Sequence, residues 1–253
     1  QRLPGRPLVI QIPMGIEAGF RGVIDLVENR ALLFSEDPAE SPREAPIPAE
    51  FQEAAQQVRE ALLEGLAEVD DQLLISYLEG RDIPVRELKA ALRRATLAAQ
   101  AVPILCGSAL KNRGIQPLLD AVIDYLPSPM DVPPVKGTDP RTGAEVERGP
   151  RDDEPFSALA FKVVSDPYMG RLVYFRVYSG QIKVGDQVLN STKDKRERIG
   201  RLVVMHANHR EEIREVDTGS IAATLGLKNT FTGDTLCERS RSVLLEPISF
   251  PEP

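Results

Sequence analysis

The chain has 253 residues, enough for roughly two domains, and 42% of them are hydrophobic, as in ordinary globular proteins. No apolar run approaches the roughly 18 residues of a membrane span, so the sequence predicts no membrane-spanning helix. The net charge of −7 argues against a protein that coats nucleic acid over its whole surface.

The two cysteines, Cys106 and Cys237, lie far apart in apolar patterns. This indicates buried free thiols of a reducing cytoplasm rather than a disulfide. No Cys/His cluster has zinc spacing, so we expect no metal site. The first residue is Gln1 rather than Met and no signal peptide follows, so we expect a segment of a longer protein.

Residues 8–34 predict a small antiparallel meander. An apolar strand over residues 8–12 should stop at Pro13, because proline has no backbone N–H. Residues 20–27 resume as a strand, and a hairpin turn at residues 28–30 leads into a strand over residues 31–34. Prolines then predict a loop, with Pro38, Pro42, Pro46 and Pro48.

Three amphipathic helices should follow this loop. The first has apolar residues at helical spacing, namely Phe51, Ala55, Val58, Leu62, Leu66 and Val69. A short helix spans about residues 71–78, and a third has Pro84 in its first turn. Between Glu50 and Glu79 stand eight acidic residues and one arginine, so this segment carries the whole net charge of −7.

Residues 102–129 have a strand–loop–helix pattern. An apolar run over residues 102–106 is followed by a turn of small residues and by a helix over residues 115–126. The helix has its apolar positions at the spacing of a helix laid on a sheet: Ile115, Leu118, Leu119, Val122, Ile123 and Leu126. Because ligands bind at the carboxyl ends of strands in open α/β sheets, the pattern predicts the last βα element of a nucleotide-binding domain.

The second half of the chain is predicted to be all-β. From Pro127 to Pro155, seven prolines and three glycines without periodicity predict a linker. Short β-rich runs follow at residues 156–164, 171–178, 186–189, 198–205, 220–225 and 235–237. Short strands at regular spacing without intervening helices predict an antiparallel barrel.

Residues 106–112, with the sequence CGSALKN, resemble the last guanine-recognition loop of the translational GTPases, and of elongation factor G in particular. The resemblance implies an incomplete guanine-binding site at Ser108, Ala109 and Leu110, whose backbone approaches the base. The family usually has Phe where Leu110 stands, which leaves this backbone role untouched. From the seven residues alone, a strand that enters a surface helix without a ligand is the alternative.

Other stretches resemble the same family. Residues 11–15 and 22–26 are similar to the opening of the insert within the GTPase domain of elongation factor G, and this resemblance continues to about Ala101. The second half resembles the second domain of translational GTPases, through residues 166–172, 176–180, 195–201 and 226–236.

The fold class implied is α/β plus all-β. It consists of the end of a P-loop-type GTPase α/β domain with an α+β insert, followed by an antiparallel translation-factor β-barrel. We expect the insert at residues 1–101, the last strand, guanine loop and helix of the GTPase domain at 102–129, a linker at 130–155 and the barrel at 156–253.

The sequence lacks the catalytic parts of a GTPase. The phosphate loop G-x-x-x-x-G-K-[ST] cradles the phosphates with backbone N–H groups and a lysine, and it does not occur in these 253 residues. The guanine-reading Asn-Lys-x-Asp motif and an Asp-x-x-Gly motif followed by His are also absent. The resemblance implies GTP or GDP with Mg²⁺ in a full-length enzyme, but we expect no catalytic residue and no bound cofactor in this segment alone.

A basic hairpin at residues 193–201 holds five bases and two acids, an excess that can hold a phosphate backbone without reading sequence. The resemblance implies contact with small-subunit ribosomal RNA through Lys195, Arg196, Arg198 and Arg201. The alternative is a solvated hairpin whose charges pair with one another. Asp194 stands where glycine is common in the family.

The first helix carries the acidic residues Glu53, Glu60, Glu64 and Glu68. An acidic outer face is usually only solvated. The resemblance instead implies contact with the basic ribosomal stalk protein, for which the charge has the required sign.

The function expected is therefore part of a ribosomal translocase, a cytoplasmic monomer that uses GTP hydrolysis to move tRNA and mRNA on the ribosome. Two alternatives remain open from the sequence. One is a close paralogue that acts in ribosome recycling or ribosomal protection. The other is a standalone RNA- or protein-binding module.

Overall fold

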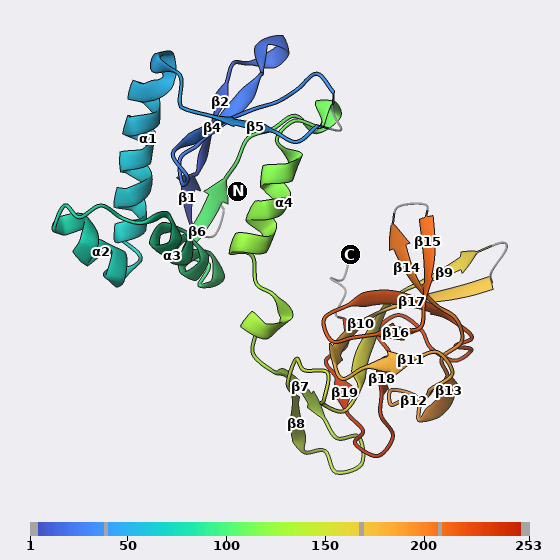
Figure 1. Ribbon diagram of the computed structural model, residues 1–253. Coiled ribbons are helices and arrows are strands. Elements are labelled where there is room, and N and C mark those ends of the chain that lie inside the picture. The colour runs from blue at the N-terminus through green and yellow to red at the C-terminus, as the bar shows by residue number, and fades with distance from the viewer. Residues whose placement is uncertain (1–4, 38–39, 167–169, 207–208, 249–253) are drawn as a thin grey trace, which may run out of the picture. The chain divides into compact units, whose positions relative to one another are not determined.

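The computed structural model describes residues 5–37, 40–166, 170–206 and 209–248. The chain divides into two compact units, Gln1–Leu126 and Pro127–Pro253, and each has its own hydrophobic core (Figure 1). Within the described ranges, no helix is long and apolar enough to cross a membrane.

An antiparallel sheet of four strands opens the first unit, in the order β2-β3-β4-β5. Its strands are β2 (Gln11–Met14), β3 (Gly22–Asp25), β4 (Arg30–Leu33) and β5 (Arg43–Ala45), with the short 3₁₀ helix η1 (Glu17–Gly19) between β2 and β3. The prediction that Pro13 ends its strand is wrong, because Pro13 lies within β2, opposite Val23. The edge position of β2 explains this, since proline is tolerated in a strand with one unpaired side.

The three predicted helices form: α1 (Ala49–Ala67), α2 (Asp71–Leu78) and α3 (Val85–Leu97). Their buried side chains belong to the same hydrophobic core as those of the sheet. The apolar stripe of α1 is confirmed, since Ala55, Leu62 and Leu66 are buried in the core of the unit. Gly65 has a packing role at the contact with the neighbouring strand. A Cβ at this position would lie 2.7 Å from Cδ2 of Leu8.

The predicted strand–loop–helix forms, but its surroundings differ from the prediction. Strand β1 (Arg6–Val9) pairs in parallel with β6 (Ala101–Ile104), and α4 (Ile115–Tyr125) follows (Figure 1). The apolar stripe of α4 is not buried: Leu118, Val122 and Leu126 are 43%, 43% and 47% exposed. A sheet of two strands is too narrow to cover it, and a hollow of about 330 Å³ lies between these side chains and β6.

The second unit is built on an antiparallel sheet of eight strands, in the order β13-β12-β18-β9-β10-β17-β14-β15. The bounds are β9 (Ser157–Asp166), β10 (Gly170–Ser179), β12 (Gln187–Asn190), β13 (Lys195–Arg198), β14 (Leu202–His206), β15 (His209–Ile213), β17 (Ile221–Leu225) and β18 (Thr235–Cys237). A second small sheet pairs β11 (Ile182–Lys183) with β16 (Glu215–Val216). The core includes the side chains of Phe156, Phe175, Leu202 and Leu236. The predicted fold class, α/β followed by an antiparallel all-β unit, is confirmed.

The expected linker over residues 130–155 is in fact part of the second unit. After η3 (Pro129–Asp131), strands β7 (Val135–Thr138) and β8 (Glu145–Arg148) form a hairpin, and β7 also pairs with β19 (Leu244–Leu245). Their inward residues pack beside Leu189, Cys237 and Val243. The sequence did not predict β7 and β8. Each has only four residues, and most of the prolines and glycines of the segment lie outside them.

Candidate functional site

The loop after β6 folds back on itself before α4. The N–H of Ser108 donates to the carbonyl of Arg113 at 2.8 Å, and the N–H of Arg113 donates to the carbonyl of Ser108 at 3.0 Å. Gly107 and Gly114 permit this close approach, since a Cβ on either would lie 2.8 Å from a backbone oxygen of the facing segment. Arg113 also ties the loop to the meander, because its guanidinium donates to the carbonyl of Phe20 at 2.6 Å.

The structure brings Ser108, Ala109 and Leu110 together at the start of the 3₁₀ helix η2 (Ala109–Lys111). The N–H of Ser108 is already used within the loop, whereas the first N–H groups of a helix have no partner inside it. Those of Ala109 and Leu110 therefore have no partner inside η2, and Leu110 is 98% exposed. A hollow of about 340 Å³ lies beside the loop, against Pro13, Phe20 and Cys106.

Both cysteines are free, as expected from the sequence. Burial raises the pKa of the Cys106 thiol to about 11, and burial also raises the pKa of Cys237. Because the thiolate is the reactive form of cysteine, neither residue is suited to act as a nucleophile at neutral pH.

The basic hairpin, residues 193–201, comprises the turn after β12, strand β13 and the segment before β14. In the ladder with β12, Arg196 lies opposite Leu189 and Lys195 lies opposite Asn190. Its four candidate residues do not form one surface. Arg198 donates from Nε to the carbonyl of Gly185 at 3.0 Å. Arg201 pairs with Glu212 at 3.4 Å on the hairpin of β14 and β15.

Glu197 is buried, although its neighbours in the chain, Arg196 and Arg198, are both exposed. One of its oxygens accepts hydrogen bonds from the backbone N–H groups of Lys228 and Asn229 at 2.5 and 2.7 Å. This carboxylate therefore holds the loop before β18 against the hairpin.

A basic groove opens beside the hairpin and was missed by the sequence analysis. Its volume is about 860 Å³, and its cations come from three segments: Arg141 from the turn between β7 and β8, Lys193 and Arg196 from the hairpin, and Arg239 after β18. The only acidic side chain among its lining residues is that of Asp194. Since Arg141 and Arg239 lie outside any charge run, no local sequence pattern indicated the groove.

The cations of this groove differ in their freedom to bind a ligand. Lys193 pairs with the buried carboxylate of Asp234 at 2.9 Å and lies 3.8 Å from the ring centroid of Phe231. Within the part of the chain that the structure describes, Arg196 and Arg239 form no ion pair or hydrogen bond through their guanidinium groups. These two exposed arginines are therefore available for an anion.

Asp194 adopts a left-handed conformation with φ +51° in the hairpin turn. Glycine adopts this conformation without the steric cost that a Cβ brings. The turn geometry therefore explains why glycine is suited to this position and why aspartate, which tolerates it better than most residues, can replace it.

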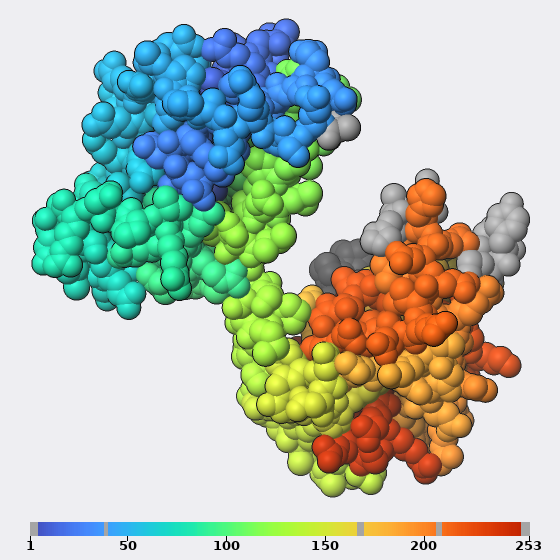
Figure 2. Space-filling view, viewed as in Figure 1, coloured from blue at the N-terminus to red at the C-terminus, as the bar shows by residue number. Residues whose placement is uncertain are grey.

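The acidic residues of α1 lie on the open surface of the first unit, where residues 49–67 are drawn in light blue (Figure 2). Glu68 forms an ion pair with Arg6. Glu60 accepts a hydrogen bond from Gln56 at 3.1 Å, and Glu53 and Glu64 have no ion pair with a described residue. Three of the four expected acids thus remain unneutralised. In the described ranges, no group of three His, Cys, Asp or Glu residues could hold a metal ion.

Comparison with known proteins finds matches to a family model, to a protein of known family and to a solved structure. Residues 155–239 match the family model Elongation factor G domain 2. The whole chain is 53% identical to an elongation factor G of Dehalococcoides mccartyi and spans 36% of that protein. A crystal structure of a protein from Thermus thermophilus matches with a TM-score of 0.74 and 27% identity, over 97% of this chain and 34% of that one. The chain thus spans about a third of the length of these relatives.

Proposed function

The chain belongs, over the residues that it spans, to the elongation factor G family, and on this premise we propose that it is part of a GTP-driven ribosomal translocase. The observation that carries the proposal is the identity of 53% along all 253 residues. The full protein binds GTP or GDP with Mg²⁺ and acts in the cytoplasm, where hydrolysis drives the movement of tRNA and mRNA.

In this proposal the first unit supplies the guanine side of the nucleotide site. The exposed turn at Ser108, Ala109 and Leu110 supports this role, with the N–H groups of the last two facing the base. The phosphate contacts and the Mg²⁺ supply most of the polar interactions in such sites, and their loop lies outside this sequence. Calorimetric titration of the 253-residue chain with GTP or GDP should therefore detect no binding. A micromolar dissociation constant would contradict the proposal that these residues supply only the guanine side of the site.

The basic groove supports contact of the second unit with ribosomal RNA. Contacts to phosphate need cations without partners, which Arg196 and Arg239 provide. Arg198 and Arg201 are held by Gly185 and Glu212, so we assign them a smaller part than the sequence suggested. Lys195 is exposed on the opposite side of β13 from Arg196, so we assign it no part in the groove.

The acidic face of α1 supports contact with the basic stalk protein of the ribosome. Glu53, Glu60 and Glu64 provide the unneutralised charge. Replacing Glu60 by Gln should weaken association with the isolated stalk protein, whereas Asp82→Asn, an equal charge change in the loop before α3, should not. Equal effects of both variants would mean that only the net charge matters.

The translocase proposal is tested by exchanging the corresponding segment of the Dehalococcoides mccartyi elongation factor G for this chain. We expect the chimaera to support ribosome-dependent translocation of tRNA and mRNA. A folded chimaera that binds GTP but does not promote translocation would contradict the proposal.

A further inference from the structure

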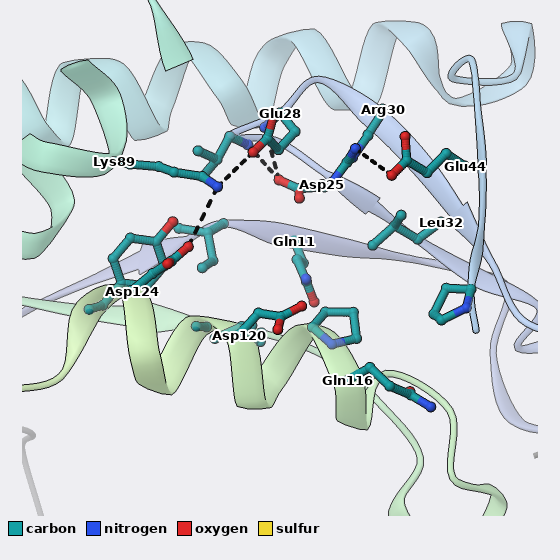
Figure 3. Close-up of a pocket in the computed structure, with 17 residues that line it drawn as sticks. Gln11, Asp25, Glu28, Arg30, Leu32, Glu44, Lys89, Gln116, Asp120 and Asp124 are labelled. Atoms are coloured by element: carbon teal, nitrogen blue, oxygen red, sulfur yellow. Dashed lines mark hydrogen bonds and ion pairs between the residues drawn. The ribbon is translucent and has the colours of Figure 1, made fainter. Parts of the chain in front are cut away.

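A polar pocket in the first unit has no part in the proposed function. It has a volume of about 200 Å³ and lies between the meander, α3 and α4 (Figure 3). Gln11 comes from β2, Asp25 from the end of β3, Lys89 from α3, and Asp120 and Asp124 from α4. The pocket therefore joins the four-stranded sheet to the helix that follows the guanine loop.

The carboxylates of the pocket outnumber its cations. Five acids line it, Asp25, Glu28, Glu44, Asp120 and Asp124, and two bases, Arg30 and Lys89. Arg30 pairs with Glu44 at 2.7 Å, and Lys89 pairs with Glu28 at 2.6 Å and with Asp124 at 3.5 Å. Among the described residues, no cation forms an ion pair with Asp25 or Asp120.

Buried amide oxygens add to this excess of acceptors. Gln11 is 5% exposed, and its Oε1 has no hydrogen-bond partner among the described residues. The same holds for Oε1 of Gln116, at the other end of the pocket. Figure 3 shows the amide of Gln11 and the carboxylate of Asp120 pointing toward one another across the pocket. The buried oxygen of Gln11 needs a donor, which the exposed carboxylate of Asp120 does not supply when it is ionised.

Asp25 is in a similar position. Its Oδ1 accepts hydrogen bonds from the N–H groups of Val27 and Glu28 at 2.9 and 3.0 Å. Burial nevertheless raises the pKa of this carboxyl group, with the neighbouring Glu28 charge acting in the same direction. The charge of Arg30 acts in the opposite direction but is the smallest of these influences, so it does not offset the burial of Asp25.

We propose that this pocket binds a protonated primary amine. An ammonium group offers three N–H donors and one positive charge, and the pocket offers unpartnered oxygens of Gln11 and Gln116 with the unpaired carboxylates of Asp25 and Asp120. Among the described residues, the acids form no group that could hold a metal ion. The amine belongs either to a free polyamine or to a lysine side chain of a partner protein.

The test is calorimetric titration of the 253-residue chain at constant ionic strength with a matched pair of ligands. One is 1,5-diaminopentane and the other is its fully N-methylated, bis-quaternary analogue, which has the same charge but no N–H donors. We expect saturable binding of the diamine alone. Equal binding of both compounds, or of neither, would overturn the proposal.

Two variants and a control locate the site. Gln11→Met and Asp120→Asn should each weaken binding of the diamine by about tenfold or more, because the first removes a hydrogen-bond acceptor and the second removes a negative charge. Asp82→Asn, the same charge change in the loop before α3 and outside the pocket, should leave the affinity for the diamine unchanged. Asp120 is exposed enough that its variant folds even if Gln11→Met does not; unchanged affinity in Asp120→Asn would overturn the assignment. Nα-acetyl-lysine amide, titrated separately, distinguishes the sources: binding as tight as the diamine indicates a protein lysine, and markedly weaker binding indicates a free polyamine.

Discussion

The buried carboxylate of Glu197 accepts a hydrogen bond of 2.7 Å from the backbone N–H of Asn229, and the same oxygen accepts one from Lys228. This relationship joins the basic hairpin to the loop before β18. The surface of the groove thus depends on an acid that faces away from it.

Replacing Glu197 by Gln should destabilise the second unit. The amide oxygen can still accept from Lys228 and Asn229, but the negative charge of these hydrogen bonds is lost, and the NH₂ group replaces the oxygen that accepts from the hydroxyl of Thr230. We expect a loss of about 1–3 kcal/mol in the free energy of unfolding, measured by urea denaturation of the chain. Glu212→Gln, at an exposed ion pair with Arg201, should stay within about 0.5 kcal/mol of the parent. Equal losses in the two variants would show that the hydrogen bonds of Glu197 do not stabilise the unit more than an exposed ion pair does.

Asp194 allows stability and charge to be separated. Both Asp194→Gly and Asp194→Ala remove the negative charge from the groove, but only glycine is free of strain at φ +51°. The alanine variant should be less stable than the glycine variant by about 1 kcal/mol, while the two bind RNA equally well. Equal stability of the two variants would contradict the left-handed turn.

Residues 127–155 should stabilise the second unit. These residues supply β7 and β8, which cover Leu189, Cys237 and Val243. A chain of residues 156–253 exposes these side chains, and burial of one large apolar side chain contributes about 1.5–3 kcal/mol. We expect residues 127–253 to unfold cooperatively on heating, and residues 156–253 to unfold at least 10 °C lower, on the order of what such a loss causes in a domain of this size. If both chains unfold at the same temperature, residues 130–155 act as a linker, as the sequence predicted.

Cys106 should react slowly with alkylating reagents. Its pKa is about 11 because of burial, so at pH 8 its thiolate fraction is roughly a hundredfold below that of an ordinary thiol. Iodoacetamide labelling, followed by mass spectrometry of the peptide that contains Cys106, measures the rate against free glutathione. A rate similar to that of glutathione would contradict the burial of Cys106 at the end of β6.

Local patterns in the sequence predicted the elements whose residues are neighbours in the chain. The spacing of Ala55, Leu62 and Leu66 was sufficient for α1, because a helix buries one face wherever it packs. Pro13 was misjudged because an edge position depends on the sheet and not on the strand. The exposure of α4 likewise depends on what covers it.

The candidate site was predictable only in part, for the same reason. Arg196 stood in a visible charge run. Arg141 and Arg239 did not, and they join it only because β7 pairs with both β8 and β19. Whether a cation is free also depends on distant partners, such as Glu212 for Arg201.

The most direct measurement is the salt dependence of ribosome binding by the chimaeric factor. Two double variants remove the same charge: Arg196→Ala with Arg239→Ala in the groove, and Arg198→Ala with Arg201→Ala outside it. Each phosphate contact contributes about 0.7 to 0.9 to the slope of log K against log salt concentration. The groove variant should therefore have a slope shallower by about 1.4 to 1.8, and the other should keep the parental slope. A parental slope in the groove variant, or the same change in both, would contradict the assignment of the groove to ribosomal RNA.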